Sequence, residues 1–277
     1  MTSSARTAGT IPIFDSLTHP SLDGSWLSSR ISLEDNSFRA NTDALIQANV
    51  RWAWAVSMAE SGAYAPTEFI RACQETDLTF LPAAYISPSA FANKSQVEEW
   101  LRLRKAMGFR GVKLHPRLGQ FDFHDPRVVD IILSANELGM IPFVCTYCYS
   151  ASMRDASLSL ESISILLRHI PYSKVVLLHG GTTRLLEMAE LTRHFKSALL
   201  DVSWTMCEFA GSSLDLDLRH VLEKCQDRVC IGSDSPEYAP HLMRSRFELL
   251  TNGMTEAARE KIAYRNLLSY SGLQATA

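Results

Sequence analysis

Four titratable side chains lie at or near the ends of apolar runs that recur along the whole sequence. They are His19, Lys113, His179 and Asp234, and the runs beside them are rich in Val, Ile, Leu and Phe. A carboxylate can act as a general base, while ammonium and imidazole groups can polarise a carbonyl and stabilise an oxyanion. These residue types favour an enzyme that performs acid–base chemistry on a small molecule.

Further polar and aromatic residues stand beside the same runs, where they are expected to contact the substrate. His115 has the same side-chain parity as Lys113, because alternate residues of a strand face the same side. Tyr147 ends another run, and Trp204 follows a third. The predicted site therefore has the catalytic residues Asp234, His179, His19 and Lys113 and the substrate-binding residues His115, Thr146, Tyr147 and Trp204.

The elements that must position these residues alternate between strand-like and helix-like patterns. Amphipathic stretches with 3.6-residue periodicity, such as 95–107 and 127–138, separate continuous apolar runs. Such runs are typical of parallel strands buried on both faces. The pattern predicts an α/β protein with a (β/α)8 TIM barrel, whose active site lies at the carboxyl ends of the strands. The expected strands are 11–15, 50–57, 79–86, 110–115, 141–147, 173–179, 197–203 and 228–233.

The length of 277 residues agrees with one barrel domain over residues 1–277, because such barrels need about 250 residues. The segment 20–46, rich in Ser, Asp and Asn, is expected to be an active-site loop. Residues 254–277 are expected to form a closing helix that begins with a capping box at Thr255.

Composition narrows the range of partners and compartments. The formal charge is −3, and there is no Lys/Arg cluster that would attract nucleic acid. No apolar run approaches the roughly 18 residues of a membrane span, and the polar N-terminus lacks the apolar region of a signal peptide. We therefore expect a cytoplasmic protein with a small-molecule substrate and no nucleic-acid or membrane partner. The composition leaves open whether the protein forms a homo-oligomer.

Four segments occur in an order and spacing that resembles the amidohydrolase superfamily, specifically its amidohydrolase-related, aminocarboxymuconate-decarboxylase-like branch. They are FRGVKLHP at 109–116, VVLLHGG at 175–181, IGSDSP at 231–236 and EKIAYRN at 260–266. The resemblance implies a (β/α)8 barrel in which His19, His179 and Asp234 keep their family positions, with Lys113 or His115 beside them.

Two positions that hold metal ligands in that family hold other residues here. The D-x-H-x-H motif of strand one reads Asp15-Ser16-Leu17-Thr18-His19, and the strand-five histidine position is assigned to Thr146. A catalytic zinc generally needs three good protein ligands and one open position. The cofactor is therefore either absent or a single divalent metal, with zinc the best match.

Cys145 and Cys148 could substitute for a missing ligand, because thiolates suit zinc. Neighbouring strand residues point to opposite sides. Cys145, next to Thr146, is therefore expected to face the helices, and Cys148, with the parity of Thr146, is the better candidate.

The sequence predicts an amidohydrolase-related hydrolase of a small lactone or amide, with Asp234 as the general base and metal dependence open. Lactones suit a metal-free site because an alkoxide leaves more readily than an amine, and the superfamily includes lactonases reported to work without metal. A nonoxidative decarboxylase of a small aromatic or enoic acid is the second hypothesis, with Arg117, Arg154 and Lys113 as available cations. The third is a non-catalytic barrel that binds a small molecule or a protein.

Overall fold

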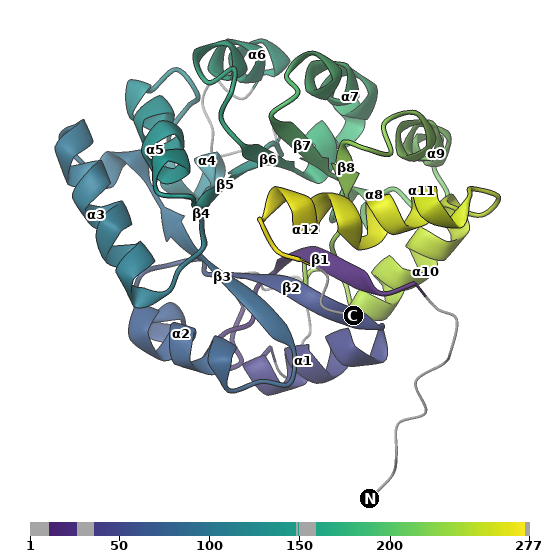
Figure 1. The fold of residues 1–277 in the computed structure, drawn as a ribbon, viewed down its shortest axis with the longest axis horizontal. Helices are drawn as coiled ribbons and strands as arrows, with labels where there is room; N and C mark the ends of the chain where they lie inside the picture. The colour runs from purple at the N-terminus through teal and green to yellow at the C-terminus, as the bar shows by residue number, and fades with distance from the viewer. Residues whose placement is uncertain (1–10, 27–35, 148, 150–158, 275–277) are drawn as a thin grey trace, which may run out of the picture.

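Eight parallel strands follow one another in chain order around a single ring, with helices outside it (Figure 1). This computed structural model describes residues 11–26, 36–147, 149 and 159–274. The predicted single (β/α)8 barrel is confirmed. The strands are β1 Ile13–Thr18, β2 Val50–Val56, β3 Thr79–Ile86, β4 Gly111–Leu114, β5 Ile141–Cys145, β6 Val175–Leu178, β7 Ala198–Asp201 and β8 Val229–Cys230.

The ring is closed by backbone hydrogen bonds between β1 and the residues that follow β8. The amide of Ser16 donates to the carbonyl of Ile231 at 3.0 Å, and the amide of Asp234 donates to Leu17 at 2.8 Å. The expected strand 228–233 is regular only at Val229 and Cys230, but these hydrogen bonds continue the ladder past it. They also fix the position of Asp234 relative to β1.

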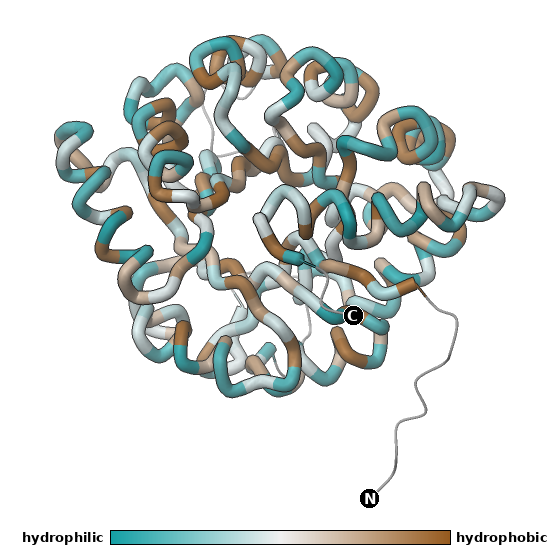
Figure 2. Tube along the Cα trace, in the orientation of Figure 1, coloured by the Kyte–Doolittle hydropathy of each residue, from teal (hydrophilic) through white to brown (hydrophobic). Residues whose placement is uncertain are grey.

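The helices form the outer layer and carry their apolar sides toward the strands, as the hydropathy colouring in Figure 2 shows. Local sequence sets their ends. The longest helix starts at the Asn93 cap, whose side chain accepts from the Gln96 amide, and stops at Gly108 in the left-handed region. The helices before β5 are α1 Phe38–Gln47, η1 Gly62–Tyr64, α2 Pro66–Gln74, η2 Pro88–Ala90, α3 Lys94–Met107, α4 Pro116–Gly119 and α5 Pro126–Glu137. Those after β5 are α6 Leu160–His169, η3 His179–Arg184, α7 Leu185–His194, α8 Thr205–Glu208, α9 Leu214–Lys224, α10 Pro240–Leu250, α11 Glu256–Glu260, η4 Lys261–Arg265 and α12 Asn266–Tyr270.

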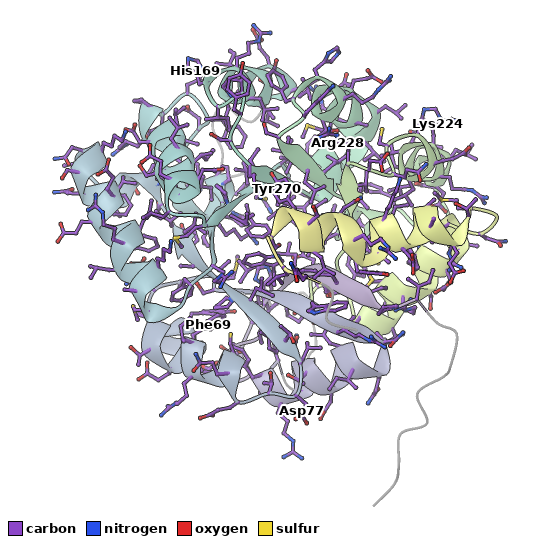
Figure 3. The ribbon with its side chains drawn as sticks, in the orientation of Figure 1. Phe69, Asp77, His169, Lys224, Arg228 and Tyr270 are labelled. Carbon is purple, nitrogen blue, oxygen red and sulfur yellow. The ribbon has the colours of Figure 1, made fainter. Side chains whose placement is uncertain are left out.

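The last helical run, α11 to α12, lies across the barrel beside β1 and β8 (Figure 1). It begins at Thr255, whose side chain accepts from the Ala258 amide, so the N-cap is confirmed. The predicted capping box is wrong, because its third helical position holds Ala258 rather than Glu or Gln. The Tyr270 hydroxyl lies 2.9 Å from the carbonyl oxygen of Val175 at the start of β6. Figure 3 shows Tyr270 near the centre of the ring. The opposite end of the barrel, at the carboxyl ends of the strands, is where an active site is expected.

The segment 20–46 is a loop over only part of its length. Residues 27–35 lie outside the described part of the chain, and α1 begins at Phe38, where Ser37 caps it. The expected loop therefore ends earlier than predicted, because the apolar positions Phe38 and Leu45 make 38–47 an amphipathic helix that packs on the barrel.

Strand register shows which side chains enter the barrel. A Cβ built on Gly111 would lie 2.9 Å from the Trp54 ring and 3.1 Å from that of Phe143, so these three residues meet inside. Lys113 follows Gly111 by two residues and pairs with Phe143 on β5 and Tyr85 on β3. Since laterally paired residues of parallel strands face the same side, Tyr85 and Lys113 both point into the barrel. Among the described residues, no helix is long and apolar enough to cross a membrane.

Candidate active site

Unusual backbone conformations gather where β6, β7 and β8 end. His179, Trp204 and Asp234 have φ of 67°, 61° and 55°, and Thr182 has 57°. A non-glycine residue in this region costs of the order of 1–3 kcal/mol, and such strain is retained mostly at functional sites. The carboxyl end of the barrel is therefore the candidate site.

His19, Lys113 and Asp234 meet at one point of this end. The Lys113 Nζ lies 3.1 Å from His19 Nε2, and Asp234 Oδ1 lies 3.3 Å from the same nitrogen. All three side chains are buried. Strands β1, β4 and β8 therefore bring together three of the four residues predicted to be catalytic.

The tautomer of His19 follows from its other nitrogen, because Nδ1 lies 2.7 Å from the carbonyl oxygen of Val56 and must donate to it. Nε2 then carries the lone pair and accepts from the Lys113 ammonium. Burial, followed by the Lys113 charge, lowers the pKa of His19 to about 4. His19 is consequently neutral at pH 7.

The carboxyl of Asp234 stays ionised although it is buried. Burial alone would raise its pKa, but the neighbouring positive charges, first that of His179 and also that of Lys113, outweigh it, and the net direction is downward. Burial lowers the pKa of Lys113, with Asp234 opposing that shift. The centre thus holds a carboxylate and an ammonium group beside the same nitrogen, Nε2, of a neutral imidazole.

His179 completes the set from the end of β6. Its backbone amide donates to Asp201 Oδ1 at 3.1 Å, and its Nδ1 lies 3.4 Å from the Ser203 hydroxyl. Burial lowers the pKa of His179, but the negative charges of Cys145 and Asp234 raise it by more than burial lowers it. The net shift of this pKa is therefore upward. His179 can therefore act as a second cationic hydrogen-bond donor in this site, beside Lys113.

Cys145 lies inside the barrel, and the expectation that it faces the helices is wrong. Its sulfur is 4.0 Å from Arg117 Nη2, which extends into the site. The parity argument failed because it placed Thr146 inside, whereas the register makes Cys145 the barrel-facing end of β5, two residues after Phe143. Burial raises the pKa of the Cys145 thiol, but the positive charges of His179, Arg117 and Lys113 lower it to about 6. Cys148, the other candidate sulfur ligand, lies outside the described residues.

Of the four residues expected to contact substrate, Tyr147 and Trp204 lie together beside His179. Their rings are 5.0 Å apart, the Trp204 ring is 6.4 Å from that of His179, and the Arg117 guanidinium covers the Tyr147 ring at 4.1 Å. These residues form an aromatic and cationic wall of the site.

The side chains of the other two residues, His115 and Thr146, form hydrogen bonds with backbone groups. His115 Nδ1 accepts from the Leu118 amide at 3.1 Å, and burial followed by Lys113 and Arg117 lowers its pKa well below the usual value. His115 is therefore neutral, with its proton on Nε2. The Thr146 hydroxyl donates to Leu178 and accepts from the Gly181 amide at 2.9 Å, which fixes the turn that carries His179.

Two buried carboxyls that were not among the predicted site residues accept hydrogen bonds from the segments that carry Asp234 and His179. Asp15 accepts from the Ser233 amide at 3.0 Å and from its hydroxyl at 2.6 Å, and burial raises its pKa to about 7. Asp201 accepts from Ser16, Ser203 and the His179 amide, and burial raises its pKa too. The signal for Asp201 was present, since it ends an apolar run like those before His179 and Asp234.

Trp26 was also missed, although it lies in the predicted active-site loop. Its ring stacks on His19 with the centroids 5.3 Å apart, and its Nε1 donates to Glu237 at 2.9 Å. A loop aromatic therefore covers the His19 side of the site.

The donor set does not fit the catalytic metal that the family implies. Leu17 is fully buried and apolar, and the inward position at the end of β5 is Cys145 rather than histidine. A divalent ion on His19 Nε2 would have to displace the Lys113 ammonium. Across the described ranges, no three His, Cys, Asp or Glu side chains converge to hold a metal.

Residues 38–266 match the family model of the amidohydrolases. This match covers most of the chain, so the protein belongs to this amidohydrolase family, as its resemblance predicted. No curated protein matches the sequence.

Solved structures with the same fold include three instructive ones. An uncharacterised TIM-barrel protein from Bordetella bronchiseptica has a TM-score of 0.77 and 17% identity over 94% of this chain and 99% of that chain. A probable 2-pyrone-4,6-dicarboxylic acid hydrolase from Acinetobacter baumannii, with citric acid bound, has a TM-score of 0.68 and 15% identity over 94% and 99%. A 5-carboxyvanillate decarboxylase from Sphingomonas paucimobilis has a TM-score of 0.66 and 11% identity over 96% and 100%. At these identities the likeness concerns the fold.

Proposed function

We propose that this amidohydrolase-family protein is a hydrolase that opens a small lactone, or cleaves a small amide, without a metal. The observation that carries the proposal is the meeting of Asp234 and Lys113 at a neutral His19, with Lys113 3.1 Å and Asp234 3.3 Å from Nε2. A carboxylate base and a cationic donor are thus held side by side in a buried site.

In the proposed reaction, Asp234 removes a proton from a water molecule as the water oxygen attacks the carbonyl carbon. The carbonyl π electrons move to oxygen, and Lys113 and His179 stabilise that oxyanion as hydrogen-bond donors. Collapse of the tetrahedral intermediate breaks the bond to the ring oxygen, which takes up the proton held by Asp234. The product is a hydroxy acid, and Asp234 returns to its starting state.

His19 acts as a positioning residue in this scheme. Its proton is committed to Val56, so its Nε2 lone pair can only accept, and it orients the Lys113 ammonium. A neutral imidazole does this without adding a second positive charge beside Lys113. Lactones remain the better substrates because their leaving group needs less assistance than an amine.

A second candidate, a nonoxidative decarboxylase, is favoured by Arg117. Its Nε is buried and, among the described residues, has no hydrogen-bond partner, and its guanidinium lies beside Cys145 and Tyr147. An arginine with a free donor suits a substrate carboxylate. The decarboxylase among the solved relatives makes this chemistry a reasonable alternative on the same fold.

A direct test incubates the purified protein with panels of lactones, amides and aromatic or enoic acids, and measures acid release and carbon dioxide release in parallel. The proposal expects acid release from lactones that is lost in Asp234→Asn. Carbon dioxide release that depends on Arg117 would instead select the decarboxylase. No turnover on any panel, with ligands that still raise the melting temperature, would favour the non-catalytic binding barrel.

A further inference from the structure

A cavity of about 300 Å³ opens at the carboxyl ends of β2 and β3, next to the catalytic cluster. Its walls include Met58, Tyr85, Phe91 and Leu118. This volume is at the lower end of the roughly 300–1,000 Å³ of small-molecule sites. The cavity can therefore hold part of a substrate and is too small for a peptide or a second domain.

Met58 joins the cavity to the catalytic residues. It lines the cavity, and its sulfur lies 3.7 Å from Lys113 Nζ. Tyr85, another lining residue, pairs with Lys113 across β3 and β4 and faces the same side. The cavity therefore lies one side chain, that of Met58, away from the Lys113 ammonium, and it is the space nearest to Lys113 for a substituent of a substrate bound there.

The walls determine what kind of substituent fits. Besides the thioether, the two rings and Leu118, the described lining contains two alanines, the hydroxyls of Tyr85 and Ser87, and one charged residue, Glu60. The Glu60 carboxylate already has a cationic neighbour, Arg104, at 3.4 Å. A carboxylate on the substituent that enters the cavity would meet this negative charge and would find no free cation among the lining residues. It would therefore lose hydration without compensation.

We propose that this cavity is the specificity subsite for an uncharged, mainly apolar substituent of the substrate. The preferred substrate class is then a monofunctional lactone with an alkyl or aryl substituent, rather than a dicarboxylate. This inference rests on the proposed hydrolase function for its reaction, but its binding part can be tested separately.

The first experiment measures kcat/KM for γ-lactones of increasing alkyl chain length. Each methylene that enters the cavity should raise kcat/KM about three- to fourfold, which corresponds to ~0.8 kcal/mol of apolar burial. The increase should stop when the cavity is full. A flat series, or a lactone with a carboxylate-terminated chain reacting faster than its methyl-terminated equivalent, would overturn the assignment.

Variants of the wall make the test specific. Ala90→Phe fills the cavity and should abolish the chain-length gain, so that kcat/KM becomes the same for short and long alkyl chains. Ala59→Phe is a second filling variant if the first does not fold. Ala257→Phe, on exposed α11 at the other end of the barrel, is the matched control and should behave as wild type. Glu60→Gln should reduce the discrimination against carboxylate-terminated chains without changing the response to alkyl length.

Calorimetry with 4-hydroxyalkanoates, the ring-opened products, separates this inference from the proposed function. If wild type hydrolyses no lactone but its affinity for these acids rises with chain length, and Ala90→Phe removes that rise, the subsite stands and the hydrolase proposal fails. If the affinity does not change with chain length, the subsite assignment is wrong even for an active lactonase.

Discussion

The ammonium nitrogen of Lys113 lies 3.1 Å from Nε2 of His19, in a buried site where His19 is neutral. Two cationic groups at this distance would repel each other strongly in a desolvated environment. The protein avoids this because Val56 holds the His19 proton on Nδ1, which leaves an acceptor facing the lysine. The positive charge at the centre of the barrel mouth is therefore supplied by the chain itself, with Asp234 as its counter-ion.

Removing the proposed base should abolish most of the activity. We expect Asp234→Asn to lower turnover by roughly 10²–10⁴, because the water molecule loses its proton acceptor. His179→Gln should cost about 10²–10³, as for loss of an oxyanion donor. Asp77→Asn, which changes an exposed carboxylate at the edge of the molecule (Figure 3), is the control. Melting temperatures must show that each variant is folded, since Asp234→Asn leaves Lys113 without its counter-ion. Near wild-type turnover in both site variants would disprove the assignment.

Lys113 should control the protonation of His19. In Lys113→Met the pKa of His19 should rise from about 4, because the neighbouring positive charge is gone, yet remain below 6.5 because burial is the larger cause. Imidazole resonances followed by NMR against pH would measure this. Lys113→Arg keeps the charge and should leave the pKa low. An unchanged pKa in the methionine variant would show that the two side chains are not in contact.

The purified protein should contain well under one equivalent of zinc, manganese or iron. Leu17 cannot ligate a metal, and Lys113 already engages His19 Nε2, so a divalent ion would have to displace it. Elemental analysis measures the content, and any activity should survive prolonged treatment with chelators. A stoichiometric metal whose removal abolishes activity would restore the ordinary mechanism of the family.

Asp15 should make stability depend on pH in a definite direction. Its pKa is about 7 in the folded protein and 3.8 in the unfolded chain, so the folded state binds the proton more tightly. The stability that this proton contributes is complete below about pH 4 and is lost as the pH rises to about 7. Asp15→Asn keeps an oxygen acceptor for the Leu17 and Ser233 amides, replaces the acceptor for the Ser233 hydroxyl with an NH2 group, and cannot ionise.

The free energy of unfolding, measured by denaturant titration, should therefore fall in wild type but not in Asp15→Asn as the pH rises from 4 to 7. The difference between variant and wild type should shift in favour of the variant by an amount of the order of a few kcal/mol. The difference between the two proteins cancels the titration of other groups, such as His19, whose lowered pKa acts in the opposite direction. A constant difference across this range would show that Asp15 is ionised in the folded state.

The sequence by itself was sufficient for the barrel. Continuous apolar runs that alternate with amphipathic stretches leave few other folds, because a strand buried on both faces needs a helix on one face and either the barrel interior or a second helix layer on the other. It also predicted which strand ends carry His19, Lys113, His179 and Asp234, since titratable groups at the ends of buried runs must face the open end of the barrel. The N-cap at Thr255 was visible for the same local reason.

Tertiary structure decided what the sequence pattern could not. Whether Cys145 or Thr146 enters the barrel depends on the register of β5 against β4, which pairs Lys113 with Phe143, and a shift of one residue exchanges the two faces. The buried pairs of Asp15 with Ser233 and of Asp201 with Ser16 join residues about 185 to 218 positions apart, so no local spacing predicts them. The charge states of His19 and Lys113 likewise follow only from their shared burial and from the direction in which the Val56 carbonyl points.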